Sequence, residues 1–334
     1  MLEIRGLTVE LPTAQGWVHP VNEVSLRIGA GECLGLVGES GSGKTMLSLA
    51  LMGLLPAGAR ISGEAWLRGV TPALRNESAA KQGTGKNGRK NLVTLSDQEF
   101  RTVRGREVAM IFQEPMTSLN PVMRVGSQIE EAVRAHEPSL RQNESHARVL
   151  TAMRQAALSE PERRAQQYPH QLSGGLRQRA MIAMALAAGP RLLIADEPTT
   201  ALDVTVQKEI LLLLQKLRRE LGLGLLFITH DLGVVAQVAD RVAVMYAGRI
   251  VEEGPASDVL GSPKHPYTQG LLAASPRLER GKLTPIPGTV PQLTALPPGC
   301  AFEPRCALRR SDCSVAVPEL RKASEAQSAR CVLI

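Results

Sequence analysis

The sequence predicts an α/β fold built on a parallel β-sheet, and three observations support this prediction. Two short apolar runs, 191–195 and 225–229, are typical of buried strands, and residues 204–221 between them have helical periodicity. A strand, a helix and a second strand joined by short links form a unit of a parallel sheet. A third apolar run, 32–37, leads into a glycine-rich turn and an apolar helix predicted over 44–55. The composition, 43% hydrophobic and 21% charged, is that of a globular protein.

The N-terminal residues predict an antiparallel sheet in addition to the parallel one. Residues 1–30 alternate apolar and polar side chains, and the polar segment 13–16 interrupts them. A period of two predicts two antiparallel strands joined by a turn. Residues 75–91 contain no large apolar side chain, so we expect a flexible surface insertion there.

The middle of the chain is predicted to be mainly helical. From residue 97 to 188 the apolar side chains follow a helical spacing, apart from a short apolar strand at 108–111. Two later apolar runs, 241–245 and 249–253, flank an Ala-Gly pair and predict a closing hairpin. Beyond residue 261 prolines become frequent and the periodicity fades. We therefore predict a main domain over 1–260, with the helical segment inserted in it, and a C-terminal tail over 261–334.

Charge and composition narrow the classes of partner. The 39 basic and 32 acidic residues give a net charge of +7, which suits nucleic acid, acidic lipid headgroups or a phosphorylated ligand. Aromatic residues make up only 3% of the chain, which argues against a platform for stacking single-stranded bases. The first residues lack the pattern of a signal peptide, and the longest apolar stretch, 180–188, is shorter than the roughly 18 residues that span a bilayer. We therefore expect a soluble, cytoplasmic chain.

A phosphate-binding motif lies between the predicted strand 32–37 and the predicted helix 44–55. The glycines of the pattern G-x-x-x-x-G-K-[ST] let the backbone N–H groups face phosphates, and the helix N-terminus adds its positive dipole. The lysine is expected to reach the β- and γ-phosphates, and the threonine hydroxyl to ligate Mg²⁺. The residues of this motif are Gly38, Glu39, Ser40, Gly41, Ser42, Gly43, Lys44 and Thr45.

Such a motif needs an acidic partner for the metal at the end of another strand. Asp196 and Glu197 follow directly after the apolar run that ends at residue 195. We expect Asp196 to hold Mg²⁺, directly or through water, and Glu197 to polarise the attacking water. A solvated strand end is the alternative reading of two adjacent acids, and the apolar run before them argues against it.

Three further polar features follow predicted strands or precede predicted helices. Gln113 follows the strand 108–111, and His230 follows the strand 225–229. Ser173 is a plausible N-cap for the helical run 180–188, and the two glycines after it expose backbone donors to an anion. Each feature alone is typical of an ordinary surface or capping residue, whereas their order along one chain points to a common function.

In this order the motifs resemble those of the ATP-binding subunit of ABC transporters, over residues 1 to about 260. The resemblance implies a P-loop NTPase core, in which a RecA-like parallel sheet is joined by an antiparallel β subdomain, and a helical signature subdomain. It also implies an ATPase that dimerises, so that two ATP molecules lie between the P-loop of one subunit and the signature of the other. The resemblance implies that Glu197 is catalytic, that His230 binds the γ-phosphate, and that Mg²⁺ is held by Thr45, Gln113 and Asp196. Gln113 is also implied to sense Mg²⁺ and to contact the membrane subunits, and Asp203 to join the two nucleotide sites. The residues implied to cap the ATP of the partner subunit are Ser173, Gly174, Gly175 and Gln178.

Adenine in this family commonly stacks on an aromatic residue of the first hairpin, at the position that Val18 occupies here. The nearest aromatic residue is Trp17. One residue along a strand reverses the side to which the side chain points. Trp17 is the predicted adenine contact, and apolar contact from Val18 is the alternative.

The tail resembles that of oligopeptide and dipeptide importer ATPases, whose relatives import dipeptides, oligopeptides, glutathione or nickel. The resemblance implies two membrane permeases, an indirectly associated periplasmic or extracellular binding protein, and a peripheral place on the cytoplasmic face of the cell membrane. It also implies a second ATPase subunit, with a heterodimer favoured over a homodimer, and no nucleic acid. An ABC ATPase acting on nucleic acid is the rival hypothesis, but such proteins carry two cassettes, zinc modules or long coiled coils. The segments that carry the resemblance are 265–272, 298–306, 51–56 and 114–121.

Four of the five cysteines lie within the last 35 residues of the chain. Disulfides are improbable in a cytoplasmic ATPase, and the close C-x₂₋₄-C pairs of structural zinc sites are absent from the spacing. We favour a structural [4Fe–4S] cluster, which the subfamily's cysteine pattern also implies, over Zn²⁺ and over unligated thiols. Cys33, in contrast, is predicted to be a small buried apolar residue. The four candidate ligands are Cys300, Cys306, Cys313 and Cys331.

Overall fold

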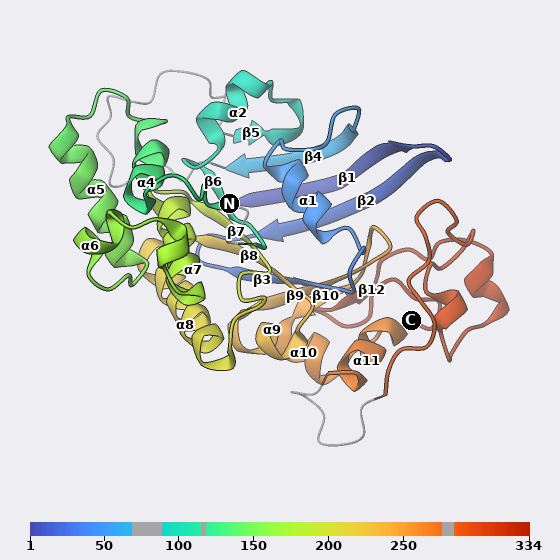
Figure 1. The fold of residues 1–334 in the computed structure, drawn as a ribbon. Coiled ribbons are helices and arrows are strands. Elements are labelled where there is room, and N and C mark those ends of the chain that lie inside the picture. The colour runs from blue at the N-terminus through green and yellow to red at the C-terminus, as the bar shows by residue number, and fades with distance from the viewer. Residues whose placement is uncertain (69–88, 115–117, 276–283) are drawn as a thin grey trace. The chain divides into compact units, whose positions relative to one another are not determined.

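The computed structural model describes residues 1–68, 89–114, 118–275 and 284–334 (Figure 1). The chain divides into two compact units, which are described separately below. The first comprises residues 1–29, 33–95 and 227–334, and the second comprises residues 30–32 and 96–226. This division assigns the tail to the same unit as the N-terminal strands. The domain boundary at residue 260 stays a prediction.

The first unit contains a four-stranded antiparallel sheet in the order β2-β1-β4-β5 (Figure 1). Leu2, Ile4, Leu7 and Val9 of β1 are buried, because alternate side chains of a strand point to the same face. β1 pairs antiparallel with β2 from Leu2 opposite Ile28 to Thr13 opposite Gly16, which confirms the predicted N-terminal hairpin. Its strands are β1 (Leu2–Thr13), β2 (Gly16–Ile28), β4 (Arg60–Arg68) and β5 (Arg89–Asn91).

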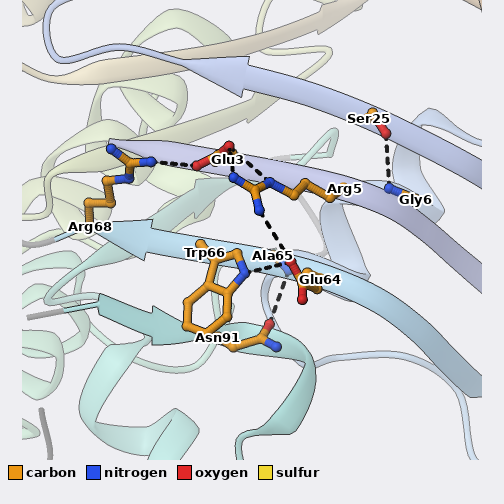
Figure 2. Close-up of polar contacts among 9 residues, drawn as sticks. All are labelled: Glu3, Arg5, Gly6, Ser25, Glu64, Ala65, Trp66, Arg68 and Asn91. Carbon is orange, nitrogen blue, oxygen red and sulfur yellow. Dashed lines mark hydrogen bonds and ion pairs between the residues drawn. The ribbon is translucent and has the colours of Figure 1, made fainter. Parts of the chain in front are cut away.

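The last strand of this sheet corrects part of the predicted insertion at 75–91. Residues 75–88 lie outside the described residues, but residues 89–91 form β5 and pair with β4. The backbone N–H of Ala65 donates to Oδ1 of Asn91 at 3.0 Å (Figure 2). This three-residue strand has no alternation of apolar and polar side chains. Backbone pairing with β4 and a side-chain hydrogen bond hold it in place instead.

Charged side chains occupy the exposed side of the same sheet (Figure 2). Glu3 accepts hydrogen bonds from Arg5 and from Arg68, both at 2.6 Å. Nε1 of Trp66 donates to Glu64 at 2.9 Å. Exposed ion pairs of this kind contribute little to stability, because water and salt screen them, so the sheet is held mainly by its buried face.

The parallel strands of the first unit lead to the phosphate-binding motif. β3 (Cys33–Val37) is buried along its whole length and runs parallel to β9 (Arg241–Tyr246). β10 (Arg249–Pro255) pairs antiparallel with β9, which confirms the predicted hairpin. α1 (Lys44–Leu51) is shorter than the predicted helix over 44–55. It ends where Gly53 adopts a positive φ of 60°, a conformation that glycine accepts without strain.

The tail packs on this part of the first unit. β12 (Ser328–Ala329) pairs with β10, and β11 (Arg321–Lys322) pairs with β12. The rings of Tyr246, Tyr267 and Phe302 lie with centroids 4.5 to 5.4 Å apart, which is the usual range for aromatic contacts. The tail and β9 therefore share one apolar cluster. Two helices come before the last strands, α10 (Ala256–Gly261) and α11 (Pro266–Ala273).

The second unit contains two buried parallel strands and a set of helices. β6 (Val108–Ile111) and β7 (Leu192–Asp196) pair in parallel, as their apolar sequences predict. Helices fill most of the predicted helical segment. They are α2 (Asp97–Val103), α4 (Val125–Arg134), α5 (Gln142–Gln155), α6 (Pro161–Ala165) and α7 (Gly174–Leu186), followed by α8 (Val204–Leu221).

The predicted strand at 225–229 is also confirmed, as β8 (Gly224–Thr229). The boundary between the two units falls within β8, between Leu226 and Phe227. α9 (Leu232–Val238) follows it. Within the described ranges, no helix combines the length and the apolar character needed to cross a membrane.

Candidate active site

The phosphate-binding motif forms a loop between β3 and α1, closed around the side chain of Lys44. Its Nζ donates to the carbonyl oxygens of Gly38 and Glu39 at 2.8 and 2.9 Å, and to Oγ of Ser42 at 3.2 Å. Lys44 is only 6% exposed. A buried ammonium with three oxygen partners fixes the curvature of the loop, because each lost bond would leave a buried polar group unsatisfied. The loop is therefore held in shape by the residue that is predicted to bind phosphate.

The start of α1 explains why glycine is needed at the last glycine position of the motif. Gly43 has a φ of 108°, and a Cβ at this position would collide with the carbonyl oxygen of Pro20. Gly43 also provides no side-chain cap for α1. A helix N-terminus of this kind presents backbone N–H groups and a positive dipole to an anion. Thr45 lies in the first turn of α1 and is exposed, so its hydroxyl is accessible to a metal ion.

Two further residues of the first unit, Trp17 and His230, are predicted to contact the nucleotide. Trp17 is 41% exposed and carries the guanidinium of Arg60 4.0 Å from its ring centroid. Val18 is 8% exposed, so neighbouring side chains point to opposite sides of β2. His230 is exposed at the end of β8, immediately before Asp231 caps α9. Adenine stacking on Trp17 and phosphate binding by His230 stay predictions.

In the second unit, Gln113 and Glu197 lie within hydrogen-bond distance. Nε2 of Gln113 donates to Oε2 of Glu197 at 3.2 Å, and Oγ1 of Thr200 donates to the same oxygen at 2.8 Å. Two donors of this kind fix the orientation of the carboxylate. Glu197 also has a φ of 47°, which is uncommon for a residue with a side chain and is typical of functional sites. Thr200 was not predicted from the sequence, and only its position three residues after Glu197 could have indicated it.

Asp196 is the last residue of β7 and is 2% exposed. Gln113 comes two residues after β6, the parallel neighbour of β7. The carboxyl ends of parallel strands meet at one edge of a sheet, which is where ligands of such sheets bind. The three polar residues predicted for this edge, Gln113, Asp196 and Glu197, therefore lie at the same end of the β6–β7 pair.

The predicted signature residues lie at the N-terminus of α7. Ser173 is the N-cap, and its Oγ accepts from the N–H of Leu176 at 3.4 Å. The predicted N-cap role of Ser173 is therefore confirmed, and α7 begins at Gly174, so that the two glycines lie in its first turn. Ser173 and Gly174 are exposed, whereas Gln178 is 2% exposed. The side chain of Gln178 is therefore packed within the second unit.

Close packing explains the second signature glycine. A Cβ on Gly175 would lie 2.7 Å from Cγ1 of Val206 in α8. Asp203 is the N-cap of α8 and accepts from the N–H of Val206 at 2.9 Å. Asp203 thus stabilises the start of the helix that packs against the signature residues, in addition to the role implied for it by the resemblance.

The four cysteines of the tail line one small cavity, together with His265 and Phe302. Burial raises the pKa of the Cys300, Cys306 and Cys331 thiols. Among the described residues, no group of three or more His, Cys, Asp or Glu side chains is arranged to hold a metal ion. Cys33 lies apart from them, fully buried in β3, as predicted for a small apolar residue.

Two known protein families match this chain, one over its predicted main domain and one mainly over its C-terminal tail. Residues 21–200 match the family described as "ABC transporter", and residues 251–313 match "Oligopeptide/dipeptide transporter, C-terminal region". The chain is 48% identical to a putative peptide import ATP-binding protein of Brucella ovis, over 99% of this chain and 96% of that protein. It is 46% identical to the oligopeptide transport ATP-binding protein OppD of Salmonella typhimurium, over 95% of this chain and 89% of that protein.

A solved structure supports the same assignment. The ATP-binding cassette MJ0796, in a dimeric post-hydrolysis state bound to ADP and Pi, superposes with a TM-score of 0.63. It is 28% identical to this chain and covers 77% of it, while 99% of the cassette is matched. The predicted fold class, a nucleotide-binding α/β cassette with parallel and antiparallel strands, is confirmed.

Proposed function

The chain belongs to the ATP-binding subunits of ABC transporters, in the oligopeptide and dipeptide importer group, and on that premise we propose that it couples ATP hydrolysis to the import of di- or oligopeptides. The observation that carries the proposal is the joint match of one chain to the cassette over 21–200 and to the peptide-transporter C-terminal region over 251–313. The first match makes the chain an ATPase, and the second favours peptides over other cargo.

In the proposed hydrolysis, different residues bind the phosphates, activate the attacking water and hold Mg²⁺. Lys44 and the N-terminus of α1 bind the phosphates through charge and backbone N–H groups. Glu197, oriented by Gln113 and Thr200, takes up the proton of the attacking water as a general base. Mg²⁺, assigned to Thr45, Gln113 and Asp196, supplies positive charge against the phosphates when it is bound.

A second subunit completes the proposed site. In this arrangement the N-terminus of α7, with Ser173 and Gly174 exposed, covers the ATP that is bound to the partner. Gly175 and Gln178 belong to the same signature, and Asp203 lies between the two nucleotides. The dimeric cassette that this chain resembles, bound to ADP and Pi, supports this part of the proposal. We favour a heterodimer with a related ATPase, and a homodimer is the alternative.

The partners that follow from this function are two membrane permeases and, indirectly, an external substrate-binding protein. We place the chain on the cytoplasmic face of the cell membrane, held there by the permeases. Gln113, exposed next to Glu197, is the residue proposed to report permease contact to the catalytic carboxylate.

Deleting the gene in its source organism is expected to abolish uptake of a radiolabelled tripeptide, because the permeases would lose their source of energy. Wild-type protein supplied from a plasmid should restore uptake, and the Glu197→Gln variant should not. The wild-type chain should also be recovered in the membrane fraction. Uptake of labelled nickel and glutathione is measured in parallel.

Two results would contradict this function. Normal peptide uptake with loss of nickel or glutathione uptake would assign another cargo to the same transporter type. Salt-sensitive binding to duplex DNA or ribosomes, without membrane association, would instead support an ABC ATPase that acts on nucleic acid.

We further propose that the four tail cysteines hold a [4Fe–4S] cluster. All four cysteines line one cavity, and four thiolates are the donor set of such clusters. The cluster would stabilise the tail when bound, because metal ligation adds folding free energy to the segment that carries the ligands. Its proposed ligands are Cys300, Cys306, Cys313 and Cys331.

Protein purified under nitrogen is expected to contain about four iron atoms per chain and to absorb broadly in the visible range. Cys306→Ser should lose this iron, because three ligands hold the cluster poorly. Cys33→Ala is the matched control and should keep it, since Cys33 lies in β3. Metal analysis checks both variants. One zinc without iron would replace the cluster by a zinc site, and absence of both metals would leave free thiols.

A further inference from the structure

An arginine of the tail binds the phosphate-binding loop directly. Nη1 and Nη2 of Arg305 donate to the two carboxylate oxygens of Glu39, at 2.7 and 3.0 Å. Glu39 is the second residue of the loop. A two-pronged contact of this kind is the strongest geometry for an arginine–carboxylate pair, and it fixes orientation as well as charge. The side chain of Arg305 is 5% exposed and that of Glu39 is 30% exposed, so the guanidinium is shielded from water and the carboxylate is partly exposed.

The surroundings of Arg305 hold it in one position. Nε donates to the carbonyl oxygen of Pro287 at 2.9 Å. The guanidinium lies 5.9 Å from the ring centroids of both Tyr246 and Phe302, within reach of a cation–π interaction. Arg305 also ends a short 3₁₀ turn, Glu303–Arg305. The position of the Arg305 side chain is therefore fixed by contacts other than its ion pair with Glu39.

A second residue of the tail binds the backbone of the same loop residue. The N–H of Glu39 donates to the hydroxyl oxygen of Tyr267, in α11, at 2.8 Å. On its other side, the carbonyl oxygen of Glu39 accepts from Nζ of Lys44 at 2.9 Å. The N–H and the side chain of Glu39 are thus held by the tail, while its carbonyl is held by the lysine that is proposed to bind phosphate.

The negative charge of Glu39 would oppose phosphate binding unless a cation such as Arg305 neutralises it. A carboxylate in a loop that binds several negative phosphate oxygens repels them, because like charges a few ångströms apart raise the free energy of the complex. Arg305 cancels this charge and pulls the carboxylate towards the tail. The remaining positive charge of Lys44 and of the helix terminus is then available to the phosphates.

We propose that Arg305 is a positioning residue for the nucleotide site: it neutralises Glu39 and holds the loop, so that affinity for ATP depends on the tail. This inference rests on the proposed binding of ATP by the loop at residues 38–45. The role of Arg305 is separate from those of the nucleotide motif and of the tail cysteines, since Arg305 is not predicted to touch the nucleotide.

The test compares ATP and AMP binding to the full-length chain by titration calorimetry. Arg305→Gln is expected to weaken ATP binding about tenfold, the scale of a lost contact to a charged group. AMP, with one phosphate, should lose much less. The Glu39→Gln/Arg305→Gln double variant should recover ATP binding to within about threefold of wild type, because it removes the uncompensated carboxylate. Arg309→Gln, an exposed arginine that pairs with Glu303 at 3.8 Å, is the matched control.

Each outcome decides for or against the inference. Equal ATP affinity of wild type and Arg305→Gln would overturn it. Equal losses for ATP and AMP, without recovery in the double variant, would also overturn it, because they would indicate a general packing role. If Arg305→Gln does not fold, Arg305→Lys replaces it. A loss of about threefold for ATP alone would support the inference, since lysine keeps the charge but lacks the paired geometry. ATP binding equal to wild type, or equal losses for both nucleotides, would overturn it.

The same titrations separate this inference from the proposed function. If wild-type chain binds no ATP, the proposed function fails and the role of Arg305 fails with it. If wild type binds ATP but Arg305→Gln binds it equally well, only the positioning role is lost.

Discussion

Replacing Glu197 by glutamine is expected to lower the rate of ATP hydrolysis at least about a hundredfold, the contribution typical of a general base. An amide has no lone pair basic enough to accept the proton of water, although it has nearly the same shape. The two donors that orient the carboxylate, Gln113 and Thr200, meet the same oxygen, so the amide oxygen can occupy that place. Nucleotide binding should therefore survive.

The measurement is steady-state phosphate release, together with ATP binding by titration and size-exclusion chromatography. Because hydrolysis is blocked, bound ATP should trap the variant in a dimer, with the related ATPase if the favoured heterodimer forms and with a second copy otherwise, that lasts longer than the dimer of the wild type. Glu220→Gln, on the exposed side of α8, removes the same charge from the second unit and should hydrolyse ATP normally. Wild-type turnover in the Glu197→Gln variant would show that another group is the base.

Two parts of the candidate site, the loop at residues 38–45 and the acidic pair, could be located in the sequence because the signals of each are contiguous. The loop at residues 38–45 has glycines at a fixed spacing, which the sequence shows directly. The structure explains one of them, because the backbone conformation of Gly43 and its contact with Pro20 leave no room for a Cβ. Asp196 and Glu197 follow an apolar run, and in the structure Asp196 is the last residue of β7, which is buried along its whole length. A buried strand of a parallel sheet has no polar face, so its ends are marked sharply.

Contacts between distant segments could not be predicted in this way. Arg305 and Glu39 are separated by 266 residues, and neither residue type is unusual where it stands. The tail lacks periodicity, so nothing in its sequence indicated that Tyr267 and Phe302 would pack against Tyr246 of β9. β5 was missed for a related reason, because its residues are polar and only its partner strand defines it.

Helix ends were predicted less well than helices, since caps depend on geometry. α1 ends at Leu51 because Gly53 turns the chain, although the apolar residues continue to Leu55. α7 begins at Gly174 despite the low helix propensity of glycine. The cap from Ser173 and the close approach of Val206 to Gly175 account for the two glycines there.

Replacing Lys44 by alanine is expected to weaken ATP binding by about a hundredfold, since a buried charged donor to the phosphates is lost. The structure adds a second reason. Nζ of Lys44 already bonds the carbonyl oxygens of Gly38 and Glu39 and Oγ of Ser42, so alanine would leave three acceptors inside the loop without their donor. The variant should therefore lose both the charge that attracts phosphate and the shape of the loop that binds it.

Titration of the full-length chain with ATP, ADP and AMP separates these two losses. Loss of charge alone should weaken ATP most and AMP least, because the Coulomb energy follows the number of phosphate charges. Loss of loop shape should weaken all three nucleotides. Lys216→Ala, on the exposed side of α8, removes the same side chain elsewhere and should bind ATP as the wild type does. ATP binding by Lys44→Ala at wild-type affinity would remove residues 38–45 from the nucleotide site, because no other side chain of this loop carries a positive charge.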